Sequence, residues 1–109
     1  MREAVLVSTA RTPIGKAYRG AHNNTQPQHL AAHAITHAAQ RAGISGHEIE
    51  DVVLGCALQE GSSGTNSARQ AALRAGLPTS VPGMTIDRQC SSGLMAIATA
   101  ANRRWIGSA

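Results

Sequence analysis

The chain has 109 residues, of which 42% are hydrophobic and 15% are charged, and its formal net charge is +4. These values are typical of a globular chain of at most one domain, and the absence of a long apolar run excludes a transmembrane helix. The basic residues are scattered, and the only two aromatic residues, Tyr18 and Trp105, do not interleave with them. We therefore expect neither nucleic acid nor a membrane as a partner, and we interpret most of the positive charge as solvated surface charge.

The two cysteines, Cys56 and Cys90, are too few for a disulfide framework and favour a reducing compartment. The first apolar run, residues 4–7, is far too short for a secretory signal, and it begins almost at Met1. These features predict a cytoplasmic protein.

The first part of the chain contains one predicted strand and one predicted helix. The apolar, β-branched run at residues 3–9 predicts a strand buried on both faces. Residues 11–26 carry proline, glycine and asparagine and predict a loop. Pro27 suits a first helical turn and Gly43 is a typical helix stop, so we expect a helix over residues 27–42.

The remaining elements continue the alternation of strand and helix. The sequence SGHE at residues 45–48 matches a capping box and predicts a short helical turn. Further strands are expected at residues 51–57 and 84–87, and further helices at residues 66–75 and 91–103. This alternation predicts an α/β fold with parallel strands and right-handed crossovers. The last helix is apolar nearly all round, which is typical of a buried helix.

Cys90 lies in the segment DRQCSSGLMA, residues 87–96, at the junction of the third predicted strand and the third predicted helix. Unpaired N–H groups and the positive end of the helix dipole favour a thiolate at a helix start. A thiolate is the nucleophilic form of cysteine, so the position favours a reactive Cys90 placed deep in the fold. The alternative is that Cys90 is a small, inert, buried residue, which is the usual role of a free cysteine.

Other candidate sites carry weaker signals. His29, His33 and His37 recur every four residues and share one helix face, a spacing that can chelate zinc. No nearby carboxylate or cysteine offers a further ligand, so we expect a solvated polar face and no metal. The GSSG segment at residues 61–64 lacks the Gly-Lys-Ser/Thr of a phosphate-binding loop and predicts a plain loop. Cys56 ends a predicted strand with no helix start after it, which favours a core or wall position.

Three segments together carry a resemblance to one enzyme family. Residues 87–96 resemble the nucleophile motif of the thiolases, the enzymes that make or cleave 3-ketoacyl-CoA thioesters. RTPIGK at residues 11–16 and NSARQAALRAGLP at residues 66–78 are similar to two further thiolase motifs, in the family's order. The resemblance runs from Val5 to Asn102. It implies that residues 1–109 form an incomplete thiolase-like N-terminal domain with a buried helix after the nucleophile.

The resemblance implies an acyltransferase that acts on acyl-CoA thioesters. Such an enzyme converts 3-ketoacyl-CoA and CoA into acyl-CoA and acetyl-CoA, or catalyses the reverse condensation. Cys90 would be the nucleophile that forms the acyl-enzyme, coenzyme A would be a substrate, and no cofactor or metal is implied. Residues 88–93 are closer to the broad 3-ketoacyl-CoA thiolases than to those restricted to acetoacetyl-CoA. The direction of the reaction and the acyl chain length stay open.

In the family a histidine and a second cysteine from the C-terminal half act as acid and base. Neither Cys56 nor any of the five histidines stands in a matching motif. The resemblance therefore implies that the chain alone is inactive and that the complete protein is a homo-oligomer. The alternative is a truncated, non-catalytic thiolase-like fragment that only associates with a partner chain.

Overall fold

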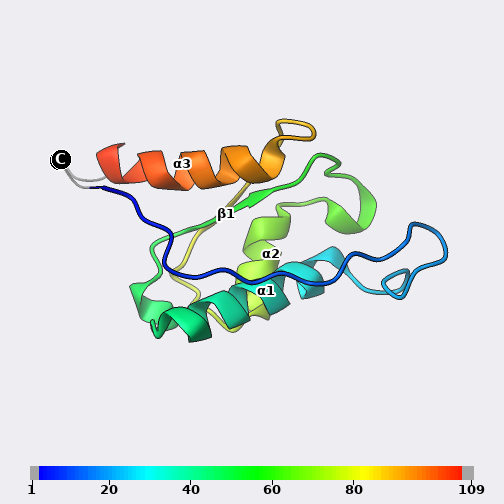
Figure 1. Cartoon of the computed structure of the whole chain (residues 1–109), viewed down its shortest axis with the longest axis horizontal. Helices are drawn as coiled ribbons and strands as arrows, with labels where there is room; N and C mark the ends of the chain where they lie inside the picture. The colour runs from blue at the N-terminus through cyan, green and yellow to red at the C-terminus, as the bar shows by residue number, and fades with distance from the viewer. Residues whose placement is uncertain (1–2, 107–109) are drawn as a thin grey trace.

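The computed structural model describes residues 3–106 (Figure 1). Among the described residues, three α-helices alternate with two strands, and two single turns of 3-10 helix, η1 and η2, lie in the connections. In chain order the elements are α1 (Pro27–Ala42), η1 (Gly46–Glu48), β1 (Val52–Gly55), η2 (Gly61–Ser63), α2 (Ser67–Arg74), β2 (Gly83–Ile86) and α3 (Ser92–Ile106).

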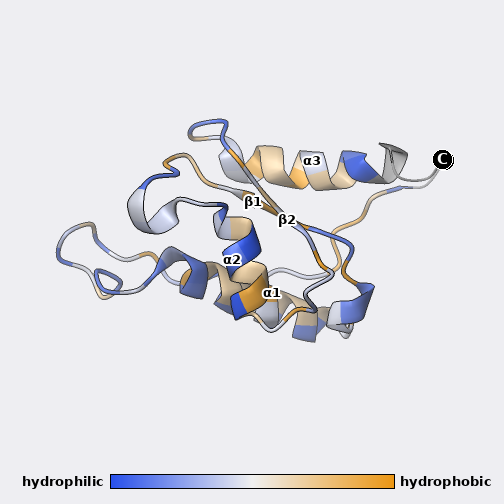
Figure 2. Cartoon of the chain, turned by 180° about the vertical axis from the view of Figure 1, so that it is seen from behind, coloured by the Kyte–Doolittle hydropathy of each residue, from blue (hydrophilic) through white to orange (hydrophobic). Residues whose placement is uncertain are grey.

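The two strands form a parallel sheet in which Val52 lies opposite Gly83 and Gly55 lies opposite Ile86. The chain passes from β1 to β2 through α2, as a parallel pair requires. The helix α3 covers one face of the sheet, and α2 and α1 lie on the other face (Figures 1 and 2). This arrangement confirms the predicted α/β fold with parallel pairing.

The core between α2 and the sheet is built from small side chains. Val52, Ala68, Ala72 and Val81 form its buried cluster. A Cβ placed on Gly83 would lie 2.6 Å from the backbone nitrogen of Arg69. Only glycine allows this approach of β2 to α2 without a shift of the helix.

Local signals placed the helix ends well. Pro27 is the first residue of α1, and Gly43 closes the helix with a φ of 69°, in the left-handed region. The capping box at Ser45 is present, because Ser45 Oγ accepts from the N–H of His47 and Glu48 Oε2 accepts from the N–H of Ser45.

No helix among the described residues combines the length and apolar character that a membrane crossing requires.

The predicted strand at residues 3–9 is not formed. Val5, Leu6 and Val7 are 72–77% exposed, and no described segment pairs with them. An apolar, β-branched run forms a strand only beside another strand that accepts its backbone hydrogen bonds. The segment instead passes α1 in extended form (Figure 1), and Arg41 donates a 2.7 Å hydrogen bond to the carbonyl oxygen of Thr9.

The prediction of a helix buried nearly all round is wrong for the described residues. In α3 the side chains of Ser92 and Ala96 are buried, whereas Leu94 and Ile97 are 73% and 53% exposed. The inner side of α3 packs on β1 and β2. Ile97, Ala100 and Ala101 line an open pocket together with residues 3–7, whereas Leu94 is largely exposed.

Candidate functional site

Cys90 lies in a tight turn between β2 and α3. The turn begins at Asp87, whose Oδ1 accepts a 2.8 Å hydrogen bond from the N–H of Gln89. Gln89 has a φ of 51°, a left-handed conformation that is uncommon outside glycine. The N–H groups of Ser91 and Ser92 then donate to the carbonyl oxygens of Arg88 and Gln89, at 3.2 Å and 3.1 Å. Cys90 therefore sits at the outer corner of a hydrogen-bonded turn.

The thiol of Cys90 precedes the first residue of α3 by two positions. Both cysteines are free, and Cys90 is exposed. The predicted position at a helix start is thus confirmed, but the predicted deep burial is wrong for the described residues, where Cys90 is exposed. The N–H groups in the first turn of a helix have no carbonyl partner within the helix, so this end of α3 favours an anionic group nearby.

A glycine at the end of β1 sets the position of this helix start. A Cβ on Gly55 would lie 2.3 Å from the carbonyl oxygen of Ser92 and 2.7 Å from the nitrogen of Gly93. All of these atoms belong to the backbone, so no side-chain rotation could relieve the clash. The first turn of α3 therefore rests directly on the end of β1, which fixes the height of the Cys90 turn above the sheet.

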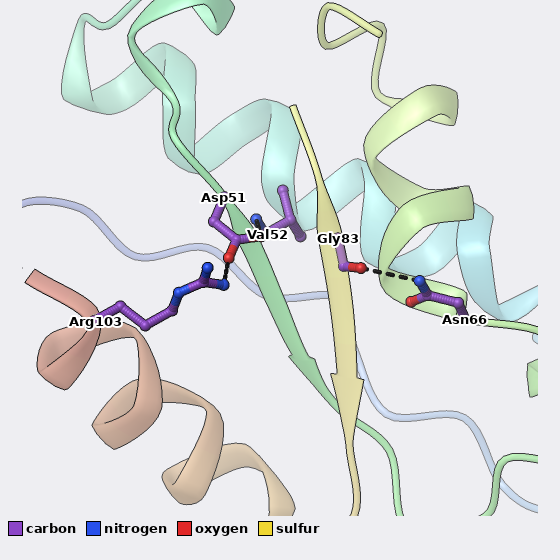
Figure 3. Close-up of polar contacts among 5 residues, drawn as sticks. All are labelled: Asp51, Val52, Asn66, Gly83 and Arg103. Atoms are coloured by element: carbon purple, nitrogen blue, oxygen red, sulfur yellow. Dashed lines mark hydrogen bonds and ion pairs between the residues drawn. The ribbon is translucent and has the colours of Figure 1, made fainter. Parts of the chain in front are cut away.

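The start of α2 is tied to β2 by side-chain hydrogen bonds. Asn66 Nδ2 donates to the carbonyl oxygen of Gly83 at 2.9 Å (Figure 3). Asn66 Oδ1 accepts from Thr85 Oγ1 at 2.8 Å, and Thr85 Oγ1 accepts from the N–H of Ala68 at 2.9 Å. This network holds in register the strand that leads to Cys90, so Asn66 supports the site structurally.

Two arginines also make contacts within the fold, although most of the described basic residues are exposed, as expected of solvated surface charge. Arg69 donates to the carbonyl oxygens of Thr79 and Val81 in the loop before β2. Arg103, in α3, forms an ion pair with Asp51 at the start of β1 (Figure 3). Asp51 Oδ1 also accepts a 2.8 Å hydrogen bond from the N–H of Val52.

The other predicted candidates lie away from this turn in the sequence and contribute none of its hydrogen bonds. The rings of His33 and His37 lie 4.3 Å apart on α1, and the described residues hold no cluster of three metal-ligating side chains. Cys56 follows β1, is half-buried, and its thiol contacts the carbonyl oxygen of Leu58 at 3.5 Å. It lines a shallow 390 Å³ pocket beside α1, which agrees with the wall position that its sequence context favours.

Sequence reasoning missed two residues that shape the turn, Gly55 and Ser92. A glycine at the end of an apolar strand is a signal for a close backbone approach, and it could have indicated Gly55. Ser92 is 4% exposed, and no sequence pattern distinguishes it from the exposed Ser91 beside it.

Comparison with known proteins identifies the family. The profile described as "Thiolase, N-terminal domain" matches residues 4–109. The chain belongs to the thiolase N-terminal domain family. It is 44% identical over 108 residues to a 3-ketoacyl-CoA thiolase of Bacillus subtilis, covering 99% of this chain and 28% of that protein. It is also 44% identical over 109 residues to an acetyl-CoA acetyltransferase of Cupriavidus necator, covering 100% of this chain and 27% of that protein.

One solved structure contains the same fold in the part that matches this chain. The crystal structure of the Bacillus anthracis acetyl-CoA acetyltransferase matches with a TM-score of 0.86 and 44% sequence identity. The match covers 93% of this chain and 25% of that chain. This thiolase-family chain therefore spans about a quarter of the length of the relatives it matches.

Proposed function

We propose that this chain carries the nucleophile of a thiolase-type acyltransferase and that Cys90 is that nucleophile. The observation that carries the proposal is the position of Cys90, exposed in a hydrogen-bonded turn at the start of α3 within a chain of the thiolase N-terminal family. The substrates are acyl-CoA thioesters and coenzyme A. The names of relatives from Bacillus subtilis and Cupriavidus necator, a 3-ketoacyl-CoA thiolase and an acetyl-CoA acetyltransferase, support this substrate class.

In the cleavage direction, the Cys90 thiolate adds to the 3-keto carbonyl carbon of a 3-ketoacyl-CoA. The bond between C2 and C3 then breaks, its electron pair stays on C2, and protonation of that carbon gives acetyl-CoA. The shortened acyl group stays on the sulfur of Cys90 as a thioester. The thiol of coenzyme A loses a proton to a base and attacks this thioester, which releases acyl-CoA and restores the thiolate.

The helix start suits the first of these steps. The N-terminal end of a helix dipole favours negative charge nearby, which suits a nucleophile that reacts as an anion. N–H groups in fixed positions also stabilise an oxygen that gains negative charge during acyl transfer. The described residues place no histidine in the hydrogen bonds of the turn, so the acid and the base come from outside residues 3–106 in this proposal.

Two further parts of the functional interpretation stay predictions. The complete protein is proposed to be a homo-oligomer that needs no cofactor besides its coenzyme A substrates. A cytoplasmic location is proposed from the cysteine content, because both cysteines are free.

A chimaera tests the proposal. Residues 1–109 replace the matching segment of the Bacillus subtilis thiolase, to which they are 44% identical. If this chain provides a functional nucleophile, the chimaera cleaves acetoacetyl-CoA in the presence of coenzyme A. Cys90→Ser in the chimaera should lower turnover by several powers of ten, because a serine hydroxyl does not ionise near neutral pH.

Cys56→Ser is the matched control, because it changes the other free thiol, which lies outside the turn. It should leave turnover within a few-fold of the parent chimaera. A folded chimaera that keeps its activity with Cys90→Ser would contradict the proposal.

A further inference from the structure

We propose that Ser92 is a positioning residue whose hydroxyl group holds the Cys90 turn in its reactive shape. This inference rests on the proposed function of Cys90. It assigns to Ser92 a role distinct from that of Ser91, although the two serines are adjacent and chemically identical.

The Ser92 hydroxyl group bridges two successive backbone groups of the turn. Its Oγ accepts a 2.8 Å hydrogen bond from the N–H of Arg88 and donates a 2.6 Å hydrogen bond to the carbonyl oxygen of Gln89. One side chain therefore holds both the peptide group before Arg88 and the peptide group after Gln89. Gln89 is the residue with the φ of 51°. The two hydrogen bonds of the Ser92 hydroxyl group, called the Ser92 clamp below, therefore hold the backbone where its conformation is least favourable.

Burial makes this clamp sensitive to change. Ser92 is 4% exposed and lies where the first turn of α3 meets Gly55. Water cannot readily replace its hydroxyl group there, so removing the hydroxyl leaves the N–H of Arg88 without its partner. Ser91 Oγ also contacts Arg88, donating to its carbonyl oxygen at 2.8 Å, but Ser91 is exposed. Water can take over the contact of Ser91.

The position of Cys90 in the turn links this pair of hydrogen bonds to the chemistry of the thiol. Cys90 stands between Gln89, which Ser92 clamps, and the first turn of α3, to which Ser92 belongs. A rigid turn holds the sulfur of Cys90 in one position relative to the start of α3. A loosened turn lets the sulfur move, so that it stands in a productive position for reaction with an electrophile less often.

The test compares Ser92→Ala with Ser91→Ala in the 109-residue chain. The rate of alkylation by iodoacetamide is measured separately at Cys90 and at Cys56 by peptide mass mapping, so Cys56 serves as an internal reference. Ser92→Ala should lower the ratio of the Cys90 rate to the Cys56 rate by about three- to tenfold, on the scale of one lost hydrogen bond. Ser91→Ala should change the ratio by less than about twofold.

Two further measurements separate positioning from general damage. Amide hydrogen exchange at Arg88 should become faster in Ser92→Ala and stay unchanged in Ser91→Ala, because only Ser92 accepts from that N–H. Ser92→Thr, which keeps the hydroxyl group, should restore most of the alkylation ratio. Equal ratios in the two alanine variants, or unchanged exchange at Arg88, would overturn the proposal.

The proposed function can fail independently of this inference. If Cys90 is not the acyl-enzyme nucleophile, Cys90→Ser leaves the chimaera active, yet the exchange at Arg88 still reports whether Ser92 clamps the turn. If Cys90 is the nucleophile but Ser92 does not position it, the chimaera depends on Cys90 while the alkylation ratio is insensitive to Ser92→Ala.

Discussion

The contact between Gly55 and the start of α3 predicts that Gly55→Ala destabilises the chain and displaces the Cys90 turn. The new Cβ would lie 2.3 Å from the carbonyl oxygen of Ser92 and 2.4 Å from its carbonyl carbon. Ordinary contact begins at 3.4 Å, so the first turn of α3 must move by about 1 Å in a close-packed interior. Overpacking of this kind costs about 1–3 kcal/mol.

Chemical and thermal unfolding followed by circular dichroism measures this cost. Each kcal/mol corresponds to a fall of about 4–8 °C in the melting temperature of a chain of this size. Gly55→Ala should therefore melt several degrees below the parent at equal protein concentration, and its Cys90 alkylation rate should fall relative to Cys56. Equal protein concentration is needed because self-association shifts the melting temperature.

Gly93→Ala is the matched control, since it adds the same methyl group on the α3 side of the same contact. Nothing lies within 4 Å of a Cβ at Gly93, so this change should be neutral or should stabilise the helix by up to about 1 kcal/mol. A Gly55→Ala variant as stable as the parent, with an unchanged alkylation ratio, would refute the reasoning.

Three further predictions follow from the described contacts. Thr85→Val should lower the free energy of unfolding by about 1–3 kcal/mol, because it removes the hydroxyl that joins Asn66 to the N–H of Ala68. Thr85→Ser keeps the hydroxyl and should keep most of the stability. Urea unfolding of both variants would check this. The 109-residue chain alone should show no cleavage of acetoacetyl-CoA above background, because its described turn lacks an acid and a base; measurable turnover would contradict this. The exposed apolar residues of α3 should make the chain self-associate. The double variant Leu94→Gln, Ile97→Gln should have a lower sedimentation coefficient and should bind less of a hydrophobic dye. A parent chain that sediments as a single monomeric species would refute this.

Features that depend on neighbouring residues in the sequence were predictable. Pro27 and Gly43 fixed the ends of α1 because each acts within one helical turn. The alternation of strand and helix predicted the parallel pairing, and the position of Cys90 at the start of α3 followed from the Ser-Ser-Gly step after it.

Features that depend on distant parts of the chain were not predictable. Residues 3–9 have the composition of a strand, but a strand needs a partner, and their sequence does not reveal whether one is present. The hydropathy of α3 predicted burial, although Leu94 is largely exposed among the described residues. Within the site, the left-handed Gln89 and the clamp of Ser92 arise from the closure of the turn, which no local pattern signals.

The central claim is that Cys90 carries the acyl group during the reaction. Its most direct test is peptide mass mapping of the chimaera, quenched in acid within milliseconds of mixing with acetyl-CoA or acetoacetyl-CoA. We expect an acetyl group on the peptide that contains Cys90, lost on addition of coenzyme A and absent in Cys90→Ser. An active chimaera with its acyl group on Cys56, or with acylation that survives Cys90→Ser, would contradict it.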